Sequence, residues 1–210
     1  MASGGCWGTR SRREGCDVSL AAGRGYGRAY CWRFRAIYSG VGAMRISNVH
    51  RRAIAAPAAR VGALLDTLSS ADDKFWPHEN WPGVKFNLPL QVGATGGHGT
   101  GPYTVSSYTP GQHIRFEFSG GRRGHHEFTL QKIDNKTCLL RHAMEARLTF
   151  NSAWRWYFLI RPLHDALIED LFDKVESQVV RFEHPRVWSS RVRKLRQKRR
   201  MSPVKNQMPR

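Results

Sequence analysis

The sequence has few cysteines and no motif that uses them in pairs. Four cysteines in 210 residues are too few for a disulfide framework, and no two of them form a CxxC pair. Cys6, Cys16 and Cys31 fall in the first 43 residues, whereas Cys138 falls in a predicted strand. This cysteine usage fits a reducing compartment, so we expect a cytoplasmic protein.

Long apolar runs and common catalytic motifs are also missing. No run approaches the roughly 20 apolar residues that span a bilayer. Arginines and glycines interrupt every apolar stretch before Met44, so we expect no secretory signal. The GxSxG turn of serine hydrolases and the GxGxxG turn of dinucleotide-binding proteins are both lacking. We therefore expect neither a serine triad nor a bound cofactor.

Acidic residues are scarce at both ends of the chain, although its formal net charge is +18. Residues 184–210 carry ten basic and no acidic side chains, and residues 1–43 carry seven and two. Residues 44–183 are nearly balanced, with 17 basic and 14 acidic. We expect a disordered basic leader over 1–43, a folded domain over 44–183 and a disordered basic tail over 184–210. Alternatively, translation begins at Met44.

The most regular stretch covers residues 152–182 and predicts a long C-terminal helix. Apolar residues recur at every fourth position, namely Leu163, Leu167, Leu171, Val175 and Val179. This spacing gives an apolar stripe wide enough to cover a sheet. Pro162 either begins the main helix or kinks a longer one. Glu169 and Asp170 are interpreted as solvated, and the apolar turn over 154–160 is expected to be buried; if it is exposed, it suits a membrane surface or a partner.

The region before this helix predicts a strand, a short helix and about five further strands. Residues 46–54 read as a strand, and Pro57 suits the first turn of a helix with its apolar face on Val61, Leu64, Leu65 and Leu68. Alternation of apolar and polar residues predicts strands over 103–108, 113–118, 125–133 and 137–149, and 90–94 is a shorter candidate. Turn residues separate these strands, which favours an antiparallel meander.

This order of elements resembles the helix-grip fold of the Bet v1-like, START-like superfamily, also called SRPBCC or polyketide cyclase/dehydrase proteins. The similar stretches are the Ala-Pro opening within 50–68, the Trp-Pro segment, GGHG at 96–99, YTV…YTPG at 103–111 and RPLHDALIED at 161–170. The resemblance covers about residues 46–182. It implies an α+β fold in which a curved antiparallel sheet wraps around a long C-terminal helix, with a cavity between them. It does not imply one activity.

Histidines on apolar strand faces are the main candidates for chemistry. His126 and His142 should lie directly opposite each other or one diagonal step apart on neighbouring strands. They are either core histidines bonded within the protein or a polar spot that orients a ligand carbonyl or hydroxyl. Two histidines without a clearly spaced third ligand make a weak metal site, so we expect no metal. The full set of candidate ligand-binding residues is Trp76, Trp81, His98, Tyr103, Ile114, Phe116, His126, Phe128, His142, Met144 and His164.

Three functions fit these features. The first is binding of a hydrophobic or amphipathic small molecule, lipid-, quinone- or polyketide-like, between the sheet and the C-terminal helix. The second is a cyclase- or aromatase-like enzyme in which a cavity histidine acts as general base. The third is an interaction protein that attaches to nucleic acid or anionic lipid through residues 184–210.

Overall fold

The computed structural model of the chain describes residues 33–39, 43–98, 102–181 and 187–199. The elements follow one another as β1 (Arg33–Ser39), β2 (Ala43–Ile54), α1 (Ala58–Leu65), β3 (Lys85–Phe86), β4 (Thr95–Gly97), β5 (Tyr103–Thr109), β6 (His113–Phe118), β7 (Arg123–Lys132), β8 (Cys138–Thr149), α2 (Phe150–Arg155), η1 (Trp156–Ile160), α3 (Arg161–Val179) and α4 (Ser190–Lys198). None of the helices within these residues is long and apolar enough to cross a bilayer.

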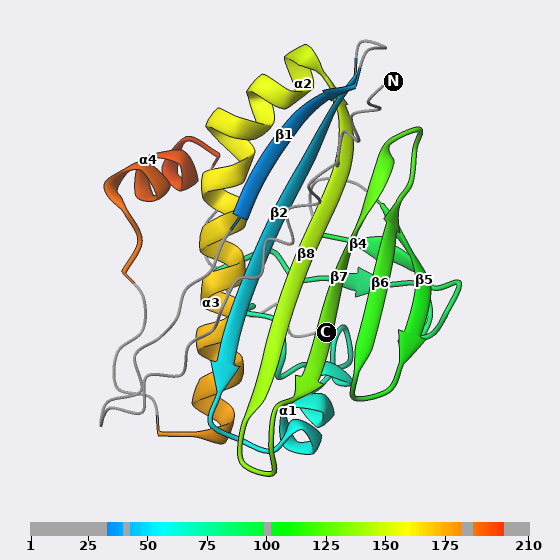
Figure 1. Cartoon of the computed structure of the whole chain (residues 1–210), viewed down its shortest axis with the longest axis vertical. Coiled ribbons are helices and arrows are strands. Elements are labelled where there is room, and N and C mark those ends of the chain that lie inside the picture. The colour runs from blue at the N-terminus through cyan, green and yellow to red at the C-terminus, as the bar shows by residue number, and fades with distance from the viewer. Residues whose placement is uncertain (1–32, 40–42, 99–101, 182–186, 200–210) are drawn as a thin grey trace, which may run out of the picture.

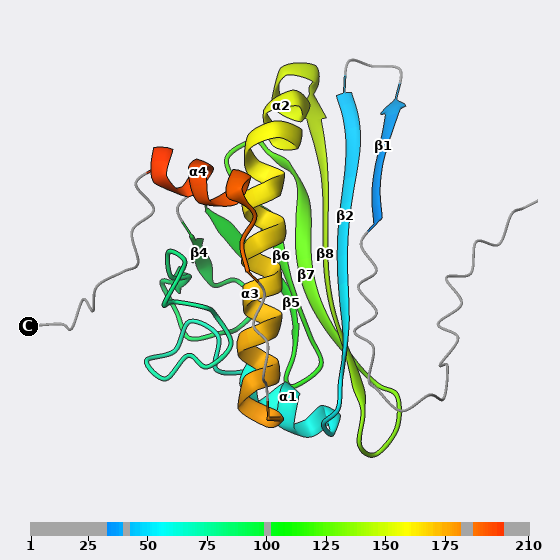
Figure 2. The same cartoon turned by 90° about the vertical axis from the view of Figure 1, so that its left-hand side faces the viewer.

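The strands form one antiparallel sheet in the order β1-β2-β8-β7-β6-β5-β4-β3. The sheet bends around α3, and α1 closes one end of the space between them (Figure 1). In Figure 2 the strand β4 lies on the other side of α3 from β2. The predicted helix-grip architecture is therefore confirmed. Strand β6 has the predicted bounds, but residues 90–94 form turns instead of a strand.

The long C-terminal helix runs through α2, η1 and α3 and contains one π-helical turn. Thr149 caps its start, because the Thr149 hydroxyl accepts a hydrogen bond from Ser152 N. The π-turn η1 ends just before Pro162, which has no N–H to donate to the carbonyl of Phe158. Pro162 thus lies in the first turn of α3, as predicted for the start of the main helix, although the chain is already helical from α2 onward. The π-turn just before Pro162 widens the helix locally, and π-turns of this kind are frequent at functional sites.

Two segments that we predicted to be disordered contain regular structure. Residues 33–39 of the expected leader form β1, which pairs with β2 from Ala43 to Val49. Residues 190–198 of the expected tail form α4, which buries Val192 and Arg196. Composition alone missed both elements, because backbone pairing and two anchoring side chains can order a segment without an apolar period. Residues 1–32, 40–42, 182–186 and 200–210 lie outside the described residues.

A row of charged and polar contacts fixes α3 against β2. Asn48, His50 and Arg52 occupy every second position of β2, so their side chains lie on the same face of the strand, and all three are buried. They meet one flank of α3, formed by Asp165, Glu169, Asp173 and Glu176. Glu169 and Asp173 are themselves 5% and 7% exposed. The helix therefore rests on the sheet through buried ion pairs as well as through its apolar stripe.

Arg52 neutralises most of this acidic flank. Its Nη2 donates to Glu169 Oε2 at 2.8 Å, and its Nη1 donates to Asp173 and, at 3.2 Å, to Glu176 Oε2. Burial opposes the charge of the guanidinium, but the carboxylates outweigh it and raise the pKa of Arg52. Removing one partner of a buried ion pair is strongly destabilising because the other charge stays buried.

We predict that Arg52→Met lowers the free energy of unfolding by about 3–5 kcal/mol. Arg45→Met is the matched control, since Arg45 lies on the same strand and bonds Glu145 at 2.7 Å on the surface. Its loss should be about 1 kcal/mol or less. Urea denaturation of both variants measures the difference. Equal losses would mean that the buried pairs do not hold α3 in place.

Candidate functional site

The inner face of the sheet brings most of the predicted site residues together. Strands β7 and β8 pair so that His126 faces Met144 and Phe128 faces His142. The two histidines are therefore diagonal neighbours, with ring centroids 5.8 Å apart. Of the two arrangements predicted from the sequence, the diagonal one is confirmed. Ile114 of β6 is fully buried beside them.

His164 of α3 closes this group from the helix side. Its ring centroid lies 5.1 Å from that of His142 and 5.3 Å from that of Trp156 in η1. On the other side, His126 packs edge-on against Tyr103 at 4.6 Å and stacks on Phe116 at 4.8 Å. We call His126, His142, His164 and Trp156 the imidazole cluster. It is contributed by β7, β8, α3 and η1, and its rings are in contact with one another or with aromatic neighbours.

Five ring nitrogens of the imidazole cluster have no hydrogen-bond partner among the described residues. They are His126 Nε2, both nitrogens of His142, His164 Nδ1 and Trp156 Nε1. His164 Nδ1 lies 4.0 Å from Asp165 Oδ1, which is too far for a hydrogen bond. Buried polar atoms in folded proteins are nearly always bonded to protein or to ordered water. Five such nitrogens in one cluster leave hydrogen-bonding capacity that ordered water or a bound molecule would satisfy.

Burial keeps the histidines of this cluster neutral. It lowers the pKa of His126 and His142 well below the usual 6.5, and it lowers the pKa of His164 despite the nearby Asp165. Burial also lowers the pKa of His98 to about 4. A neutral imidazole offers one donor and one acceptor. The cluster can therefore bond carbonyl and hydroxyl groups without carrying charge.

His98 extends the polar line toward the glycine-rich segment. Its Nε2 lies 3.2 Å from Tyr103 Oη, and its ring lies 4.9 Å from that of Trp76. Trp81 is placed elsewhere: its indole N–H donates to Asp170 at 2.7 Å, and its ring meets Trp188 at 6.0 Å. Trp81 thus belongs to the contact between α3 and the α4 segment, apart from the imidazole cluster.

His50 has the opposite electrostatics, although its ring lies only 6.4 Å from His142 and 6.2 Å from His164. Its Nδ1 contacts Glu169 Oε1 at 3.0 Å, and its Nε2 contacts Asp165 Oδ1 at 3.2 Å. Burial disfavours its charge, but the two carboxylates outweigh burial and raise its pKa. When both ring nitrogens donate to these carboxylates, both carry protons and His50 is an imidazolium. The contacts of His50 therefore favour its charged form, whereas burial favours the neutral form of the cluster.

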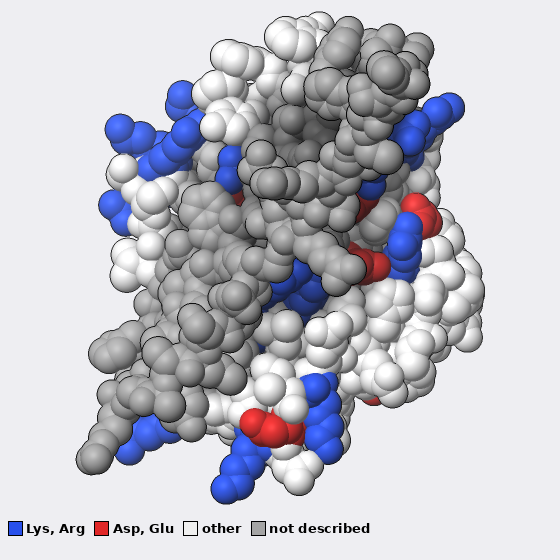
Figure 3. Space-filling model, viewed as in Figure 1, with Lys and Arg blue, Asp and Glu red and all other residues white. Residues whose placement is uncertain are grey.

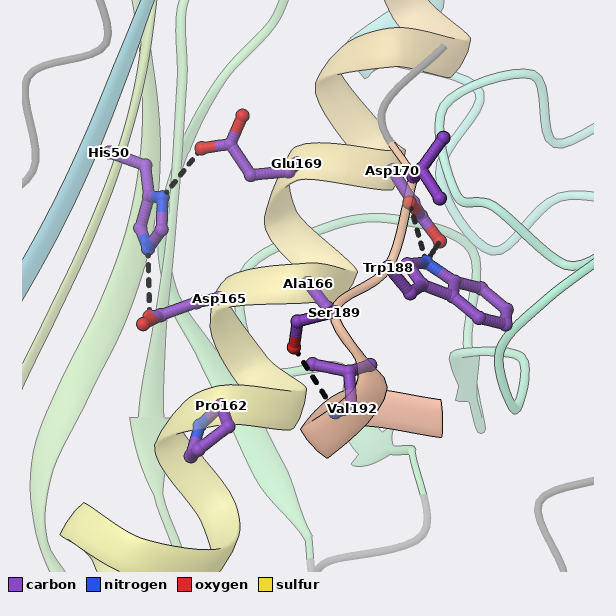
Figure 4. Close-up of a pocket in the computed structure, with 10 residues that line it drawn as sticks. His50, Pro162, Asp165, Ala166, Glu169, Asp170, Trp188, Ser189 and Val192 are labelled. Atoms are coloured by element: carbon purple, nitrogen blue, oxygen red, sulfur yellow. Dashed lines mark hydrogen bonds and ion pairs between the residues drawn. The ribbon is translucent and has the colours of Figure 1, made fainter. Parts of the chain in front are cut away.

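A pocket of about 290 Å³ opens on the far side of His50. One wall is the flank of α3 with Asp165, Glu169 and Asp170, and the other is residues 187–192 (Figure 4). Five of the lining side chains on these two walls are apolar or aromatic, namely Pro162, Ala166, Val187, Trp188 and Val192. The pocket thus contains none of the residues predicted as ligand contacts. His50 separates it from the imidazole cluster.

Asp170 joins the two walls of this pocket. Its carboxylate accepts hydrogen bonds from the indole N–H groups of Trp81 and Trp188. Burial raises its pKa, although both indoles favour the charged form. Asp170 and Glu169 were interpreted as solvated from the sequence, and this was wrong. Both lie beside the apolar stripe, on helix flanks that β2 and the α4 segment cover.

The group His50, His164 and Asp165 could in principle hold a divalent ion, since one ligand atom from each lies within 4.8 Å of the others. Two features oppose this role. Both ring nitrogens of His50 already contact carboxylates, and Asp165 Oδ1 already accepts from Asn48 Nδ2 at 2.9 Å. The carboxylate and the imidazolium satisfy each other, and the geometry fits an ion-pair network better than a metal site.

Sequence reasoning missed Asn48, His50 and Trp156. A signal was present in β2, where polar residues occupy every second position between Ile46 and Ile54. Their match to the acidic residues at 165, 169, 173 and 176 requires knowing that β2 lies against that flank of α3. Trp156 stands in an apolar stretch of the sequence, and this pattern does not indicate that its indole N–H lies beside the histidines.

Comparison with known proteins finds solved structures with a similar fold. No protein-family model matches the sequence, and no curated protein matches it. The solved structure of CalU16 from Micromonospora echinospora is similar with a TM-score of 0.50 at 13% identity, covering 81% of this chain and 93% of its own. A protein from Thermobifida fusca gives 0.52 at 16% identity, covering 68% and 99%. Norcoclaurine synthase from Thalictrum flavum, in complex with dopamine and hydroxybenzaldehyde, gives 0.50 at 11% identity, covering 71% and 98%.

At these identities the similarity concerns the fold alone. The chain has the Bet v1-like, SRPBCC-type fold, as its sequence predicted. Neither an activity nor a ligand follows from that.

We predict that the protein loses stability as pH falls from about 6.5 toward 4. The histidines of the imidazole cluster and His98 have lowered pKa values in the folded state, so the unfolded chain binds more protons than the folded chain in this window. Each such histidine lowers the free energy of unfolding by up to about 1.4 kcal/mol for each unit by which the pH falls. His50 has a raised pKa, so its contribution is complete below pH 6.5 and is lost as pH rises through its folded pKa.

Urea denaturation between pH 7 and 4 measures this slope, and His142→Phe isolates one contribution. The variant should lose less stability than the native chain over the same pH range. A steeper loss in the variant would contradict the assignment of His142 as a buried neutral group.

Proposed function

We propose that the protein binds a small amphipathic molecule between the sheet and α3, with its polar groups on the imidazole cluster. The observation that carries the proposal is the set of five buried ring nitrogens without a partner among the described residues. Leaving a buried donor or acceptor unsatisfied costs about 1–3 kcal/mol. Several such groups would use much of the 5–15 kcal/mol by which a domain is stable. A bound molecule would recover this loss.

The chemistry of the cluster narrows the class of ligand. Neutral imidazoles in an apolar setting suit carbonyl and hydroxyl groups, whereas a carboxylate would bring an uncompensated charge into the interior. The surrounding side chains of Tyr103, Ile114, Phe116, Phe128 and Met144 are buried and mostly apolar or aromatic. We therefore favour a quinone- or polyketide-like compound over a fatty acid. Norcoclaurine synthase, which shares the fold, holds small aromatic molecules in its solved complex.

Binding is favoured over catalysis by the protonation state of the histidines. A general base works best when its pKa lies near the working pH. Burial moves the pKa of His126 and His142 well below that range, which makes them poor bases but intact hydrogen-bonding groups. A cyclase-like reaction with one of them as base remains the alternative. It would require that the ligand itself raises the pKa of a histidine.

We predict that His126→Phe weakens ligand binding and stabilises the empty protein. The substitution removes an unsatisfied nitrogen and adds apolar volume, so the free energy of unfolding should rise, whereas affinity should fall about tenfold for one lost hydrogen bond. His125→Phe is the control, because the neighbouring residue of a strand points to the opposite face. It should leave affinity unchanged.

Menadione serves as the quinone probe and oleate as the fatty-acid probe. Each probe is titrated into the protein, and native mass spectrometry measures the bound fraction. The same instrument identifies any molecule that co-purifies with the protein. Binding of neither probe, together with no co-purifying organic molecule, would leave only water for these nitrogens and refute the proposal.

A further inference from the structure

The end of the molecule formed by α2 and η1 exposes large apolar side chains. Phe150, Trp154, Tyr157 and Leu159 are 68%, 62%, 44% and 41% exposed. The ring of Phe158 contacts two of them, with its centroid 4.1 Å from that of Trp154 and 4.9 Å from that of Tyr157. The turn over 154–160 was expected to be buried; Trp156 is buried, whereas Trp154, Tyr157 and Leu159 are exposed, which is the case for which a membrane surface or a partner was expected. We call these five residues the aromatic patch; contiguous exposed patches of this kind mark interaction sites.

Basic residues surround the aromatic patch, and acidic residues are absent from its sequence neighbourhood. Residues 146–164 contain Arg147, Arg155 and Arg161 but no Asp or Glu. Helix α4 contains five basic and no acidic residues between Ser190 and Lys198. In Figure 3, Lys and Arg side chains gather over α4, beside the uncharged surface over α2. The positive charge at this end of the molecule would attract an anionic partner.

Specific contacts fix α4 beside the aromatic patch. Arg191 Nη2 donates to Phe158 O at 2.9 Å, which is the carbonyl that Pro162 cannot serve. The guanidinium of Arg196 lies 4.4 Å from the ring centroid of Trp81 and 4.1 Å from that of Trp188. With α4 held in this way, Lys194 and Lys198 remain exposed. The basic and aromatic groups thus form one continuous surface.

We propose that the aromatic patch and α4 together dock on an anionic lipid bilayer. Trp and Tyr favour the membrane interface because their rings are apolar at one end and polar at the other. Lys and Arg add attraction to anionic headgroups, and apolar insertion combined with basic charge is the pattern of interfacial helices. A nucleic acid duplex would satisfy the charge but not the apolar side chains at this end, and unpaired bases could stack on the aromatic rings but would leave Leu159 without an apolar partner. The inference does not depend on the ligand proposed above.

The test uses the full chain with phosphatidylcholine vesicles, with and without phosphatidylserine, in a flotation assay. We expect binding only to the vesicles that contain phosphatidylserine. Brominated acyl chains should quench tryptophan fluorescence on binding, and Trp154→Ser should remove most of this quenching and weaken partitioning about tenfold. Ile133→Ser is the matched control, since Ile133 is 51% exposed in the turn before β8, at the opposite end of that strand from Phe150. It should change neither quantity.

A charge-reversal pair tests the role of α4. Lys194→Glu with Lys198→Glu should weaken vesicle binding about tenfold or more. Lys132→Glu with Lys136→Glu, at the β7–β8 turn, makes the same change in net charge and should have little effect. Equal effects of the two pairs, or binding that survives Trp154→Ser unchanged, would overturn the proposal. So would retention of the chain on RNA or DNA without any binding to vesicles. Probe binding in solution should be the same in all these variants, which separates this proposal from the previous one.

Discussion

The ion-paired contact between β2 and α3 is the constraint on which the rest of the structure depends. Alternate residues of a strand are about 6.6 Å apart, and residues four apart on a helix are about 6 Å apart. Asn48, His50 and Arg52 therefore meet successive turns of the acidic flank of α3 nearly in step. A shift by one strand residue would turn all three side chains to the other face. This contact sets the position of α3 along the sheet and so places His164 over His142.

The same helix shifts the pKa values of neighbouring histidines in opposite directions. His50 faces two carboxylates from α3, which raise its pKa, whereas burial lowers the pKa of the histidines in the imidazole cluster. The carboxylate of Asp165 borders the cluster, with its Oδ1 4.0 Å from His164 Nδ1. A negatively charged ligand would be repelled there, which agrees with the uncharged ligand proposed above.

The sequence predicted those parts of the structure that follow a local period. The alternation in β6, the diagonal relation of His126 and His142, and the apolar stripe of α3 are all local patterns, and all three are present. The burial of Glu169, the order of α4 and the exposure of Trp154 depend on segments far apart in the chain. Composition describes how polar a segment is, but it does not describe which partner the folded chain brings to it. For this reason the imidazole cluster was largely foreseen, whereas the pocket beside His50 was not.

The carboxylate of Asp170 binds two indoles, one from the segment before β3 and one from the segment before α4. Through it, residues beyond the long helix become part of the wall of the pocket. A fragment cut after residue 183, where composition suggests a boundary, would lose both Trp188 and Arg196 and would open Asp170 to solvent. Such a fragment would retain the sheet and the long helix, yet it would be a different protein at the place where the pocket lies. Among the described residues, the packed unit therefore extends at least to α4.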